Sequence, residues 1–313
     1  MVVVVMKFLR LEPDGVKRVI VTDPSSAEIV AYLDGVSRIA GRCDKCIRPR
    51  AIMRAPVVVR SSLDIDVNLP SRVIDELISS HIRSGGKLFE LDYGMVESID
   101  PDLIVGQSLC DVCAITPREI EEQLSSHNLA GYPIYDYSPR FYMDIPRRAL
   151  RLAKLLDRVD RAERLLGDFE VTLDSVSDAC TGLRIAVLEW IDPLYHAGLW
   201  TSDLLHLMGA ETLIPPGVHG SRITTDMLLD FQPDIIVVVP CGFPVERTLR
   251  EIHLLTGSTW WRRLKAVKSN MVFVVEHYLL DGATPEVMNA ARVLEGICRR
   301  GIVSSSLGVR LKL

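Results

Sequence analysis

The sequence predicts an α/β protein made of two Rossmann-like lobes with parallel sheets, bridged by one long spanning helix. Three observations lead to this fold class: short β-branched runs alternate with helical stretches, a strand-and-helix pattern occurs twice, and a long helical segment separates the two occurrences. At 313 residues, with 48% of them hydrophobic, the chain is long enough to bury two cores of ordinary domain size.

The expected strands are short apolar runs bounded by turn or polar residues, which is the pattern of strands buried on both faces of a sheet. They cover residues 18–23, 102–107, 184–190, 234–240 and 271–277. A helix is expected over 25–36, with Ser25 or Ser26 capping its first turn. A Pro-Asp turn precedes one strand in each half, "PDLI" and "PDII", which is why we expect two similar lobes.

The segment 144–179 has apolar residues near helical spacing, and Pro146 suits a first helical position. We therefore expect an N-terminal α/β lobe over 1–140, a spanning helix over 141–179 and a C-terminal α/β lobe over 180–313. One helix along both lobes would leave a ligand cleft between them.

Charge and hydropathy exclude several classes of protein. A net charge of −5 provides no basic surface for nucleic acid. The N-terminal apolar run "MVVVVM" is too short for a secretory signal and lacks its basic leader, and no later stretch is long enough to span a bilayer. We expect a cytoplasmic protein. Gln and Asn are scarce, which is typical of hot-growing sources, so disulfides remain an option even in that compartment.

Several segments of the chain resemble a known family. The two-lobe pattern with its Pro-Asp turns is similar to the class III periplasmic-type substrate-binding proteins, which carry cobalamin and iron-siderophores, from Arg18 to about Gly301. More narrowly, six segments resemble a leaderless branch labelled as cobalamin-binding proteins: 42–49, 84–92, 106–116, 187–200, 240–249 and 261–277. The resemblance implies a small metal chelate as ligand, cobalamin or another corrinoid above all, and leaves a transporter partner open.

Candidate ligand-binding residues follow the predicted strands, because ligands of open α/β sheets bind beyond the carboxyl ends of the strands. In the first lobe these are Pro24, Ser25, Ser26 and Gln107. In the second lobe they are Glu189, Trp190, Tyr195, His196, Trp200, Gly242, Phe243, His277 and Tyr278.

The aromatic residues and the histidines have two interpretations each. Trp190 and Trp200 are either core side chains or, with Tyr195, the wall of a site for a flat macrocycle such as a corrin. His196 and His277 are either ordinary surface or core residues, or axial donors to cobalt or haem iron.

The cysteines carry the sharpest local signal. Two Cys-x-x-Cys pairs, Cys43 with Cys46 and Cys110 with Cys113, follow first-lobe strands, and Cys241 follows a second-lobe strand. Thiolates in such a group would bind zinc or an iron-sulfur cluster. The alternative is structural, with buried cysteines and one disulfide among them. Cys180 and Cys298 have the character of ordinary buried residues.

Two hypotheses from different classes remain. The first is a binding protein that holds a corrinoid or related metal chelate between the lobes. The second is a cysteine-cluster metalloprotein that binds zinc or an iron-sulfur centre, with redox activity as an option. No Ser-His-Asp order, phosphate-binding glycine loop or paired-carboxylate motif stands out, so the sequence favours binding over catalysis.

Overall fold

A computed structural model describes residues 15–312, which fall into two compact units. The first unit contains the chain up to Asp64, His81–Ser138 and Pro146–Leu166, and the second contains Ile65–Ser80, Pro139–Ile145 and the chain from Gly167 onward. The N-terminal apolar run lies outside the described residues. The limits 1–140, 141–179 and 180–313 stay predictions.

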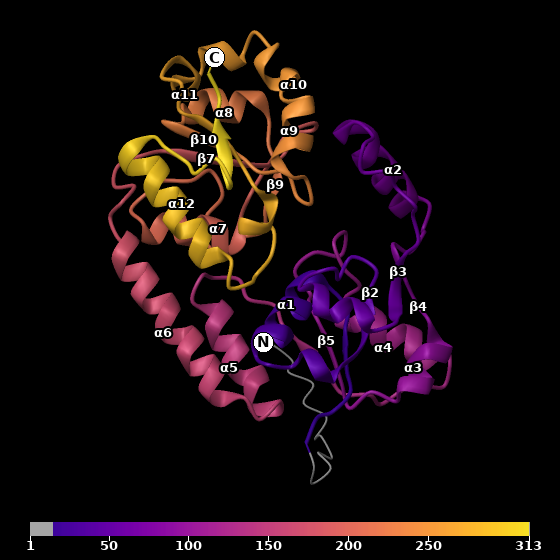
Figure 1. The fold of residues 1–313 in the computed structure, drawn as a ribbon. Helices are drawn as coiled ribbons and strands as arrows, with labels where there is room; N and C mark the ends of the chain where they lie inside the picture. The colour runs from indigo at the N-terminus through magenta and orange to yellow at the C-terminus, as the bar shows by residue number, and fades with distance from the viewer. Residues whose placement is uncertain (1–14, 313) are drawn as a thin grey trace. The chain divides into compact units, whose positions relative to one another are not determined.

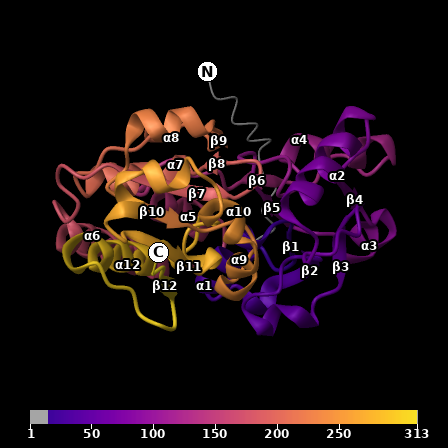
Figure 2. The ribbon, with the colours of Figure 1, turned by 90° about the horizontal axis from the view of Figure 1, so that it is seen from above.

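The first unit is built on a mixed sheet. Its strands are β1 (Val19–Val21), β2 (Ile39–Cys43), β3 (Val57–Ser61), β4 (Phe89–Leu91), β5 (Leu103–Gly106) and β6 (Ile134–Asp136). They lie in the order β4-β3-β2-β1-β5-β6, and every pair is parallel except β3 with β4. Figure 1 shows this unit in indigo to magenta, and Figure 2 labels its six strands. Each residue of the central strands β1 and β5 is buried, as the uninterrupted apolar runs predict.

Helices connect these strands or follow the last of them. They are α1 (Pro24–Tyr32), α2 (Ser71–Arg83), α3 (Tyr93–Ile99), α4 (Pro117–Ser126) and α5 (Asp144–Leu155), with short 3₁₀ turns η1 (Val36–Arg38) and η2 (Arg50–Arg54). The N-cap of α1 is Asp23 rather than Ser25 or Ser26, because the Asp23 carboxylate accepts the Ser26 N–H and Pro24 occupies the first turn.

The second unit also has a mixed sheet, which corrects the expectation of purely parallel sheets. Its strands are β7 (Ile185–Trp190), β8 (Tyr195–His196), β9 (Ser221–Arg222), β10 (Ile235–Val238), β11 (Val272–Val275) and β12 (Gly308–Arg310), in the order β12-β11-β10-β7-β8-β9. Only β10 pairs parallel with both its neighbours, β7 and β11. Strands β8, β9 and β12 pair antiparallel, with β9 and β12 at the two edges of the sheet, and at two or three residues each they are too short to show a hydrophobic period.

The helices of the second unit enclose a buried core around this sheet. They are α7 (Leu199–Leu207), α8 (Thr225–Phe231), α9 (Val245–Glu251), α10 (His253–Thr256), α11 (Lys265–Lys268) and α12 (Val287–Arg300), with η3 (Trp261–Arg263) and η4 (His277–Leu279). Figure 2 shows these orange-to-yellow elements gathered around the sheet. Leu188, Ile236, Val238 and Trp261 belong to one buried apolar cluster. Among residues 15–312, no helix has the length and apolarity needed to cross a membrane.

The segment expected as one long helix is two helices, α5 and α6 (Val159–Val176). Asp157 interrupts it in the left-handed backbone region, with φ of 50°. The Arg158 N–H then donates to the Ala153 carbonyl oxygen, which closes the end of α5 in the manner of a Schellman motif. Hydrophobic spacing continues across this break, so periodicity alone could not reveal it.

One disulfide joins distant parts of the second unit. Cys180 and Cys298, expected as ordinary buried residues, are bonded to each other across a sequence separation of 118. Cys180 follows α6 and Cys298 lies on α12. The bond therefore ties α12 to the segment that follows α6.

Candidate functional site

The carboxyl edge of the first sheet begins with Asp23 and α1. Asp23 is buried, and desolvation raises its pKa to about 6 although hydrogen bonds from Ser26 act in the opposite direction. Ser26 is buried and its hydroxyl donates to the Asp23 carboxylate, so its role is local capping. Pro24 is exposed and Ser25 is half-buried, which leaves these two as the accessible candidates on α1.

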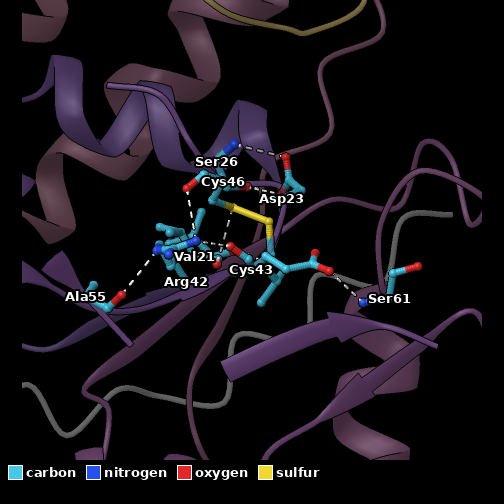
Figure 3. The surroundings of a disulfide bond; sticks show 11 residues. Val21, Asp23, Ser26, Arg42, Cys43, Cys46, Ala55 and Ser61 are labelled. Atoms are coloured by element: carbon cyan, nitrogen blue, oxygen red, sulfur yellow. Dashed lines mark hydrogen bonds between the residues drawn. A yellow bond between two sulfur atoms is a disulfide. The ribbon is translucent and has the colours of Figure 1, made fainter. Parts of the chain in front are cut away.

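The Cys43–Cys46 pair at the end of β2 is a buried disulfide (Figure 3). Cys43 is 4% and Cys46 is 0% exposed. The Arg42 guanidinium donates to the backbone carbonyl oxygens of Ala55, Cys43 and Cys46 and so holds this turn against the segment that contains Ala55. These two sulfurs are thus part of the packed interior of the first unit.

The second Cys-x-x-Cys pair is a disulfide between Cys110 and Cys113 and is more accessible, because Cys113 is exposed and Cys110 half-buried. Gln107 holds this loop: its side-chain oxygen accepts the N–H groups of Leu109 and Cys110, and its amide donates to the Cys110 carbonyl oxygen. Gln107, a candidate ligand residue in the sequence, is 7% exposed and engaged in this turn.

The expected thiolate group is not formed in this structure, because a sulfur in a disulfide is not a thiolate. Cys43, Cys46, Cys110 and Cys113 are all paired locally. In the part of the chain that the structure describes, no group of three or more His, Cys, Asp or Glu side chains is suited to a metal ion. The free Cys241 is exposed and belongs to the second unit.

An aromatic pair marks the carboxyl edge of the second sheet. Trp190, at the end of β7, packs against Phe243, which follows β10, with ring centroids 4.9 Å apart. The Arg247 guanidinium lies over the Phe243 ring at 4.3 Å. The Trp190 indole nitrogen is buried and has no hydrogen-bond partner among the described residues. A buried donor without a partner is costly, so this N–H suits a ligand acceptor.

Glu189 precedes this pair and is half-buried. Desolvation raises the pKa of its carboxyl group to about 7. The carboxylate lies against Gly220, where an added Cβ would meet the Glu189 Oε1 atom at 2.0 Å. A side chain at position 220 would therefore displace Glu189, and this close approach explains the glycine.

His277 lies beside the same edge, on η4 after β11. Its Nδ1 atom is 2.5 Å from the Asp281 Oδ2 atom, and Asp281 also accepts the Gly242 N–H at 3.1 Å. Tyr278 packs edge-on against the imidazole, with ring centroids 6.0 Å apart. Asp281 thus connects the loop after β10 with the loop after β11.

His196 and Trp200 are structural, unlike the ligand roles considered for them. His196 is 0% exposed; its Nε2 atom accepts the Val187 N–H and its Nδ1–H donates to the Ala197 carbonyl oxygen. Burial lowers its pKa to about 4, so it is neutral and has no free nitrogen for a metal. Trp200 is 8% exposed, and its indole N–H donates to the Leu280 carbonyl oxygen.

Tyr195 on β8 is half-buried, and desolvation followed by the charge of Asp75 raises its pKa. Asp75 belongs to α2, whose first part is assigned to the second unit. Tyr195 therefore interacts with α2, and only the exposed part of its side chain is available to a ligand.

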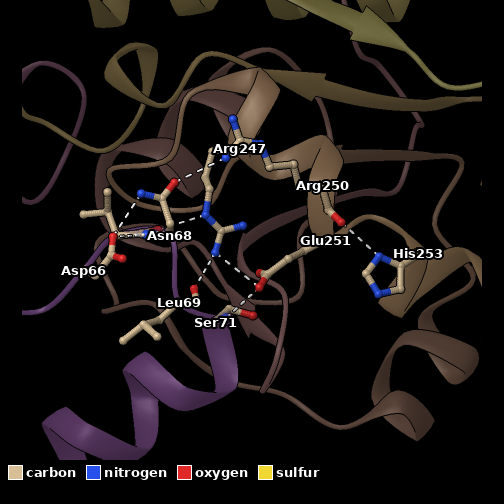
Figure 4. A network of polar contacts seen from close by, with 9 residues as sticks. Asp66, Asn68, Leu69, Ser71, Arg247, Arg250, Glu251 and His253 are labelled. Atoms are coloured by element: carbon tan, nitrogen blue, oxygen red, sulfur yellow. Dashed lines mark hydrogen bonds and ion pairs between the residues drawn. The ribbon is translucent and has the colours of Figure 1, made fainter.

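A cavity of about 150 Å³ adjoins the aromatic pair. It is lined by Val67, Asn68, Gly242, Phe243, Pro244, Glu246, Arg247 and Arg250. Arg247 forms its polar side: it donates to the carbonyl oxygens of Val67 and Leu69 and pairs with Glu251, which accepts the Ser71 N–H (Figure 4). The chain segment 65–71 is thereby held on α9.

Sequence reasoning missed Asp281 and Arg247. Asp281 stands four residues after His277, a spacing at which side chains meet on a helical turn, and this was the available signal. No local pattern connects Arg247 with residues 67–71, which are about 180 positions away, so only the tertiary structure could reveal that contact.

Comparison with known proteins identifies the family. A family model described as "Periplasmic binding protein" matches residues 19–279. None of the curated proteins matches the chain. Among solved structures, the periplasmic vitamin B12 binding protein of Vibrio cholerae has a TM-score of 0.67 and 16% identity, with 91% of this chain and 99% of that chain covered.

Two further structures are similar over nearly their whole length. A periplasmic haem binding protein from Pseudomonas aeruginosa has a TM-score of 0.68 and 16% identity over 95% of this chain and 99% of that chain. An ABC-type Fe3+-hydroxamate transport system protein from Saccharomonospora viridis has a TM-score of 0.62 and 15% identity over 91% and 93%. At these identities the likeness shows the two-lobe fold alone, whereas the family model covers most of the sequence. The chain belongs to the periplasmic binding protein family.

Proposed function

We propose that this protein binds a small metal chelate, a corrinoid such as cobalamin or a related haem or iron-siderophore complex, and holds it without transforming it. The observation that carries this proposal is the Trp190–Phe243 pair with its unpartnered indole N–H at the carboxyl edge of the second sheet. Aromatic walls with a few placed polar groups are typical of sites for flat, largely apolar ligands.

Two polar groups beside the pair support the same ligand class. Desolvation raises the pKa of the Glu189 carboxyl group to about 7, so near neutral pH this group can donate or accept a hydrogen bond. His277 presents an imidazole on the neighbouring loop. The similar solved structures are named for vitamin B12, haem and Fe3+-hydroxamate as ligands or transported species, and all three are metal chelates.

The cysteine-cluster hypothesis has less support. Six of the seven cysteines form disulfides, and the remaining Cys241 is a single thiol. A zinc or iron-sulfur site needs several thiolates, and reduction of the local pairs would have to precede it.

A transporter is the partner that we propose. One of the similar structures is described as an ABC transporter substrate-binding protein, from Listeria monocytogenes. The cytoplasmic location expected from the N-terminal residues is likewise a proposal, and fractionation of source cells with an antibody to this chain would test it.

Ligand binding is measurable through tryptophan fluorescence. We expect one of cyanocobalamin, cobinamide, hemin or a ferric hydroxamate to quench the emission on titration, with calorimetry giving the affinity. Trp190→Leu removes ring contact with the ligand and is expected to weaken binding by about 1–3 kcal/mol, roughly 5- to 150-fold.

Trp260→Leu is the matched control, because this half-buried tryptophan packs against Trp261 and does not belong to the aromatic pair. It should leave the affinity within about twofold of the wild-type value. Flat calorimetry and unchanged fluorescence with all four chelates would refute the proposed function.

A further inference from the structure

His277 and Asp281 form a hydrogen-bonded dyad. What this dyad indicates about the ligand narrows the proposed function and rests on it. The Nδ1···Oδ2 distance is 2.5 Å, and the side chains are 28% and 20% exposed. Asp281 is fixed in turn by the Gly242 N–H at 3.1 Å. The carboxylate therefore has a defined position between two loops and can orient the imidazole.

The dyad determines which ring nitrogen of His277 is available. A carboxylate accepts only, so the neutral imidazole carries its proton on Nδ1 and donates it to Asp281. The lone pair is then on Nε2, which contacts no hydrogen-bonding partner within the described part of the chain. A histidine that donates one N–H to a carboxylate while the other nitrogen is free has the arrangement of a metal-ligating histidine with its supporting carboxylate.

The surrounding residues keep the imidazole in place before any ligand binds. Tyr278 packs edge-on against the ring. The loop that carries both members of the dyad is anchored by the Trp200 indole N–H, which donates to the Leu280 carbonyl oxygen. Leu279 and Leu280 are 0% and 6% exposed and hold the loop on the core. Binding then costs little side-chain ordering.

We infer that His277 binds the metal of the chelate through Nε2 as an axial ligand, and that the ligand is a planar tetrapyrrole, haem or a corrinoid, with an open axial position. The Nε2 lone pair forms a coordinate bond and a water molecule leaves the metal, so no electron is transferred. A ferric hydroxamate complex fills all six positions of iron with its own oxygens and offers none to an imidazole. The aromatic pair on the adjacent loop suits the flat ring of a tetrapyrrole.

Cys241 is the competing donor at this edge. Although Cys241 is exposed as a residue, desolvation of its thiol and the negative charges of Asp281 and Glu189 raise the pKa of that thiol, which disfavours the thiolate that a metal needs. Tyr278 is the other neighbouring group with a donor oxygen. The experiment therefore has to separate the imidazole from both.

The test uses hemin and cobinamide as probes, with absorption and electron paramagnetic resonance spectra of the full chain. We expect nitrogen ligation with wild-type protein, its loss in His277→Ala with affinity at least tenfold lower, and restoration of the spectrum when free imidazole is added to that variant. Asp281→Asn should shift the spectrum and keep the ligation. His253→Ala, which removes an exposed histidine of the same unit, should leave spectrum and affinity unchanged.

Different failures are distinguishable. If hemin or cobinamide binds wild-type protein and His277→Ala with identical spectra, or if only Cys241→Ser or Tyr278→Phe removes the ligation, the axial role of His277 is wrong while the proposed function stands. Binding of the ferric hydroxamate alone also overturns the inference and leaves the proposed function. If none of the chelates binds, the proposed function itself fails.

Discussion

At the scale of single residues, each unit has a carboxyl group with a raised pKa at the carboxyl edge of its sheet. Asp23 in the first unit and Glu189 in the second are both desolvated acids with raised pKa values, about 6 and about 7. Asp23 receives hydrogen bonds from Ser26, whereas no such bond offsets the burial of Glu189. A carboxyl group that is costly to ionise in the folded protein is typical of a functional site.

Glu189 is expected to make the protein less stable as pH rises. A glutamate in the unfolded chain has its ordinary pKa of 4.5, whereas the pKa of Glu189 in the folded protein is about 7. Between these pH values the unfolded state binds fewer protons, so the free energy of unfolding falls. Glu189→Gln removes this titration and should gain about 2–3 kcal/mol over the wild type between pH 5 and pH 8. Urea unfolding at both pH values measures the difference.

The raised pKa of Asp23 also lowers the free energy of unfolding as pH rises, between about pH 4 and pH 6. The wild type and Glu189→Gln both contain Asp23, so this effect cancels in the comparison. Parallel stability curves for the wild type and Glu189→Gln would show that the carboxyl group titrates normally.

At the scale of elements, two connections depart from the expected pattern. Asp157 divides the linking helix into α5 and α6. The connection between β3 and β4 contributes residues 65–80 to the second unit, although both strands belong to the first. In this segment the N-terminus of α2 is bound by Glu251, a carboxylate at the positive end of a helix.

The Arg247–Glu251 pair is expected to be the main anchor of residues 65–71. Both side chains are buried, 7% and 9% exposed, so Arg247→Ala leaves an unpaired buried carboxylate and two unsatisfied carbonyl oxygens. The loss of stability should be about 3–5 kcal/mol by urea unfolding, with faster hydrogen exchange at the Ser71 amide.

Arg250→Ala is the control, since Arg250 is exposed and makes one 3.3 Å hydrogen bond to Asn68; its cost should stay below about 1 kcal/mol. The double variant Arg247→Met/Glu251→Leu should recover much of the loss, because it removes the orphaned charge. If Arg247→Ala is no more harmful than Arg250→Ala, the segment is held by other contacts.

At the scale of the whole molecule, the disulfides divide by the length of chain that they close. Cys180–Cys298 spans 118 positions, whereas Cys43–Cys46 and Cys110–Cys113 span three each. A cross-link restricts the unfolded chain more when its loop is longer. The Cys180–Cys298 disulfide is therefore expected to stabilise the fold most. The Cys43–Cys46 and Cys110–Cys113 disulfides are expected mainly to fix the conformation of the turns that contain them.

Replacing both distant cysteines tests this expectation. Cys180→Ser/Cys298→Ser should lower the free energy of unfolding by about 5 kcal/mol, and Cys43→Ser/Cys46→Ser by about 2 kcal/mol from loop closure. Urea unfolding without reductant compares the two, and thiol counts on unfolded protein verify the pairing. Equal losses, or a full set of reactive thiols in the untreated wild type, would contradict the assignment.

The sequence by itself determined the α/β class, the five buried central strands and the positions that follow them. These features depend on local hydrophobic pattern and turn chemistry, which are written in consecutive residues. The short antiparallel strands β8, β9 and β12, the break at Asp157 and the partners of the cysteines depended on the tertiary structure. A strand of two residues is too short to show a hydrophobic period. The residues around a cysteine do not indicate which other cysteine it is bonded to.

In the candidate site, too, the sequence determined some features and only the tertiary structure decided others. Glu189, Trp190, Phe243 and His277 were predicted because they lie at the carboxyl ends of strands or in the loops after them, and the carboxyl ends of parallel strands share an edge. Whether a residue there is available to a ligand depends on what else contacts it. His196 has both ring nitrogens bonded inside the sheet, whereas His277 has one nitrogen bound by Asp281. Hydrogen-bond partners come from packing between distant segments, so only the tertiary structure could separate these two histidines.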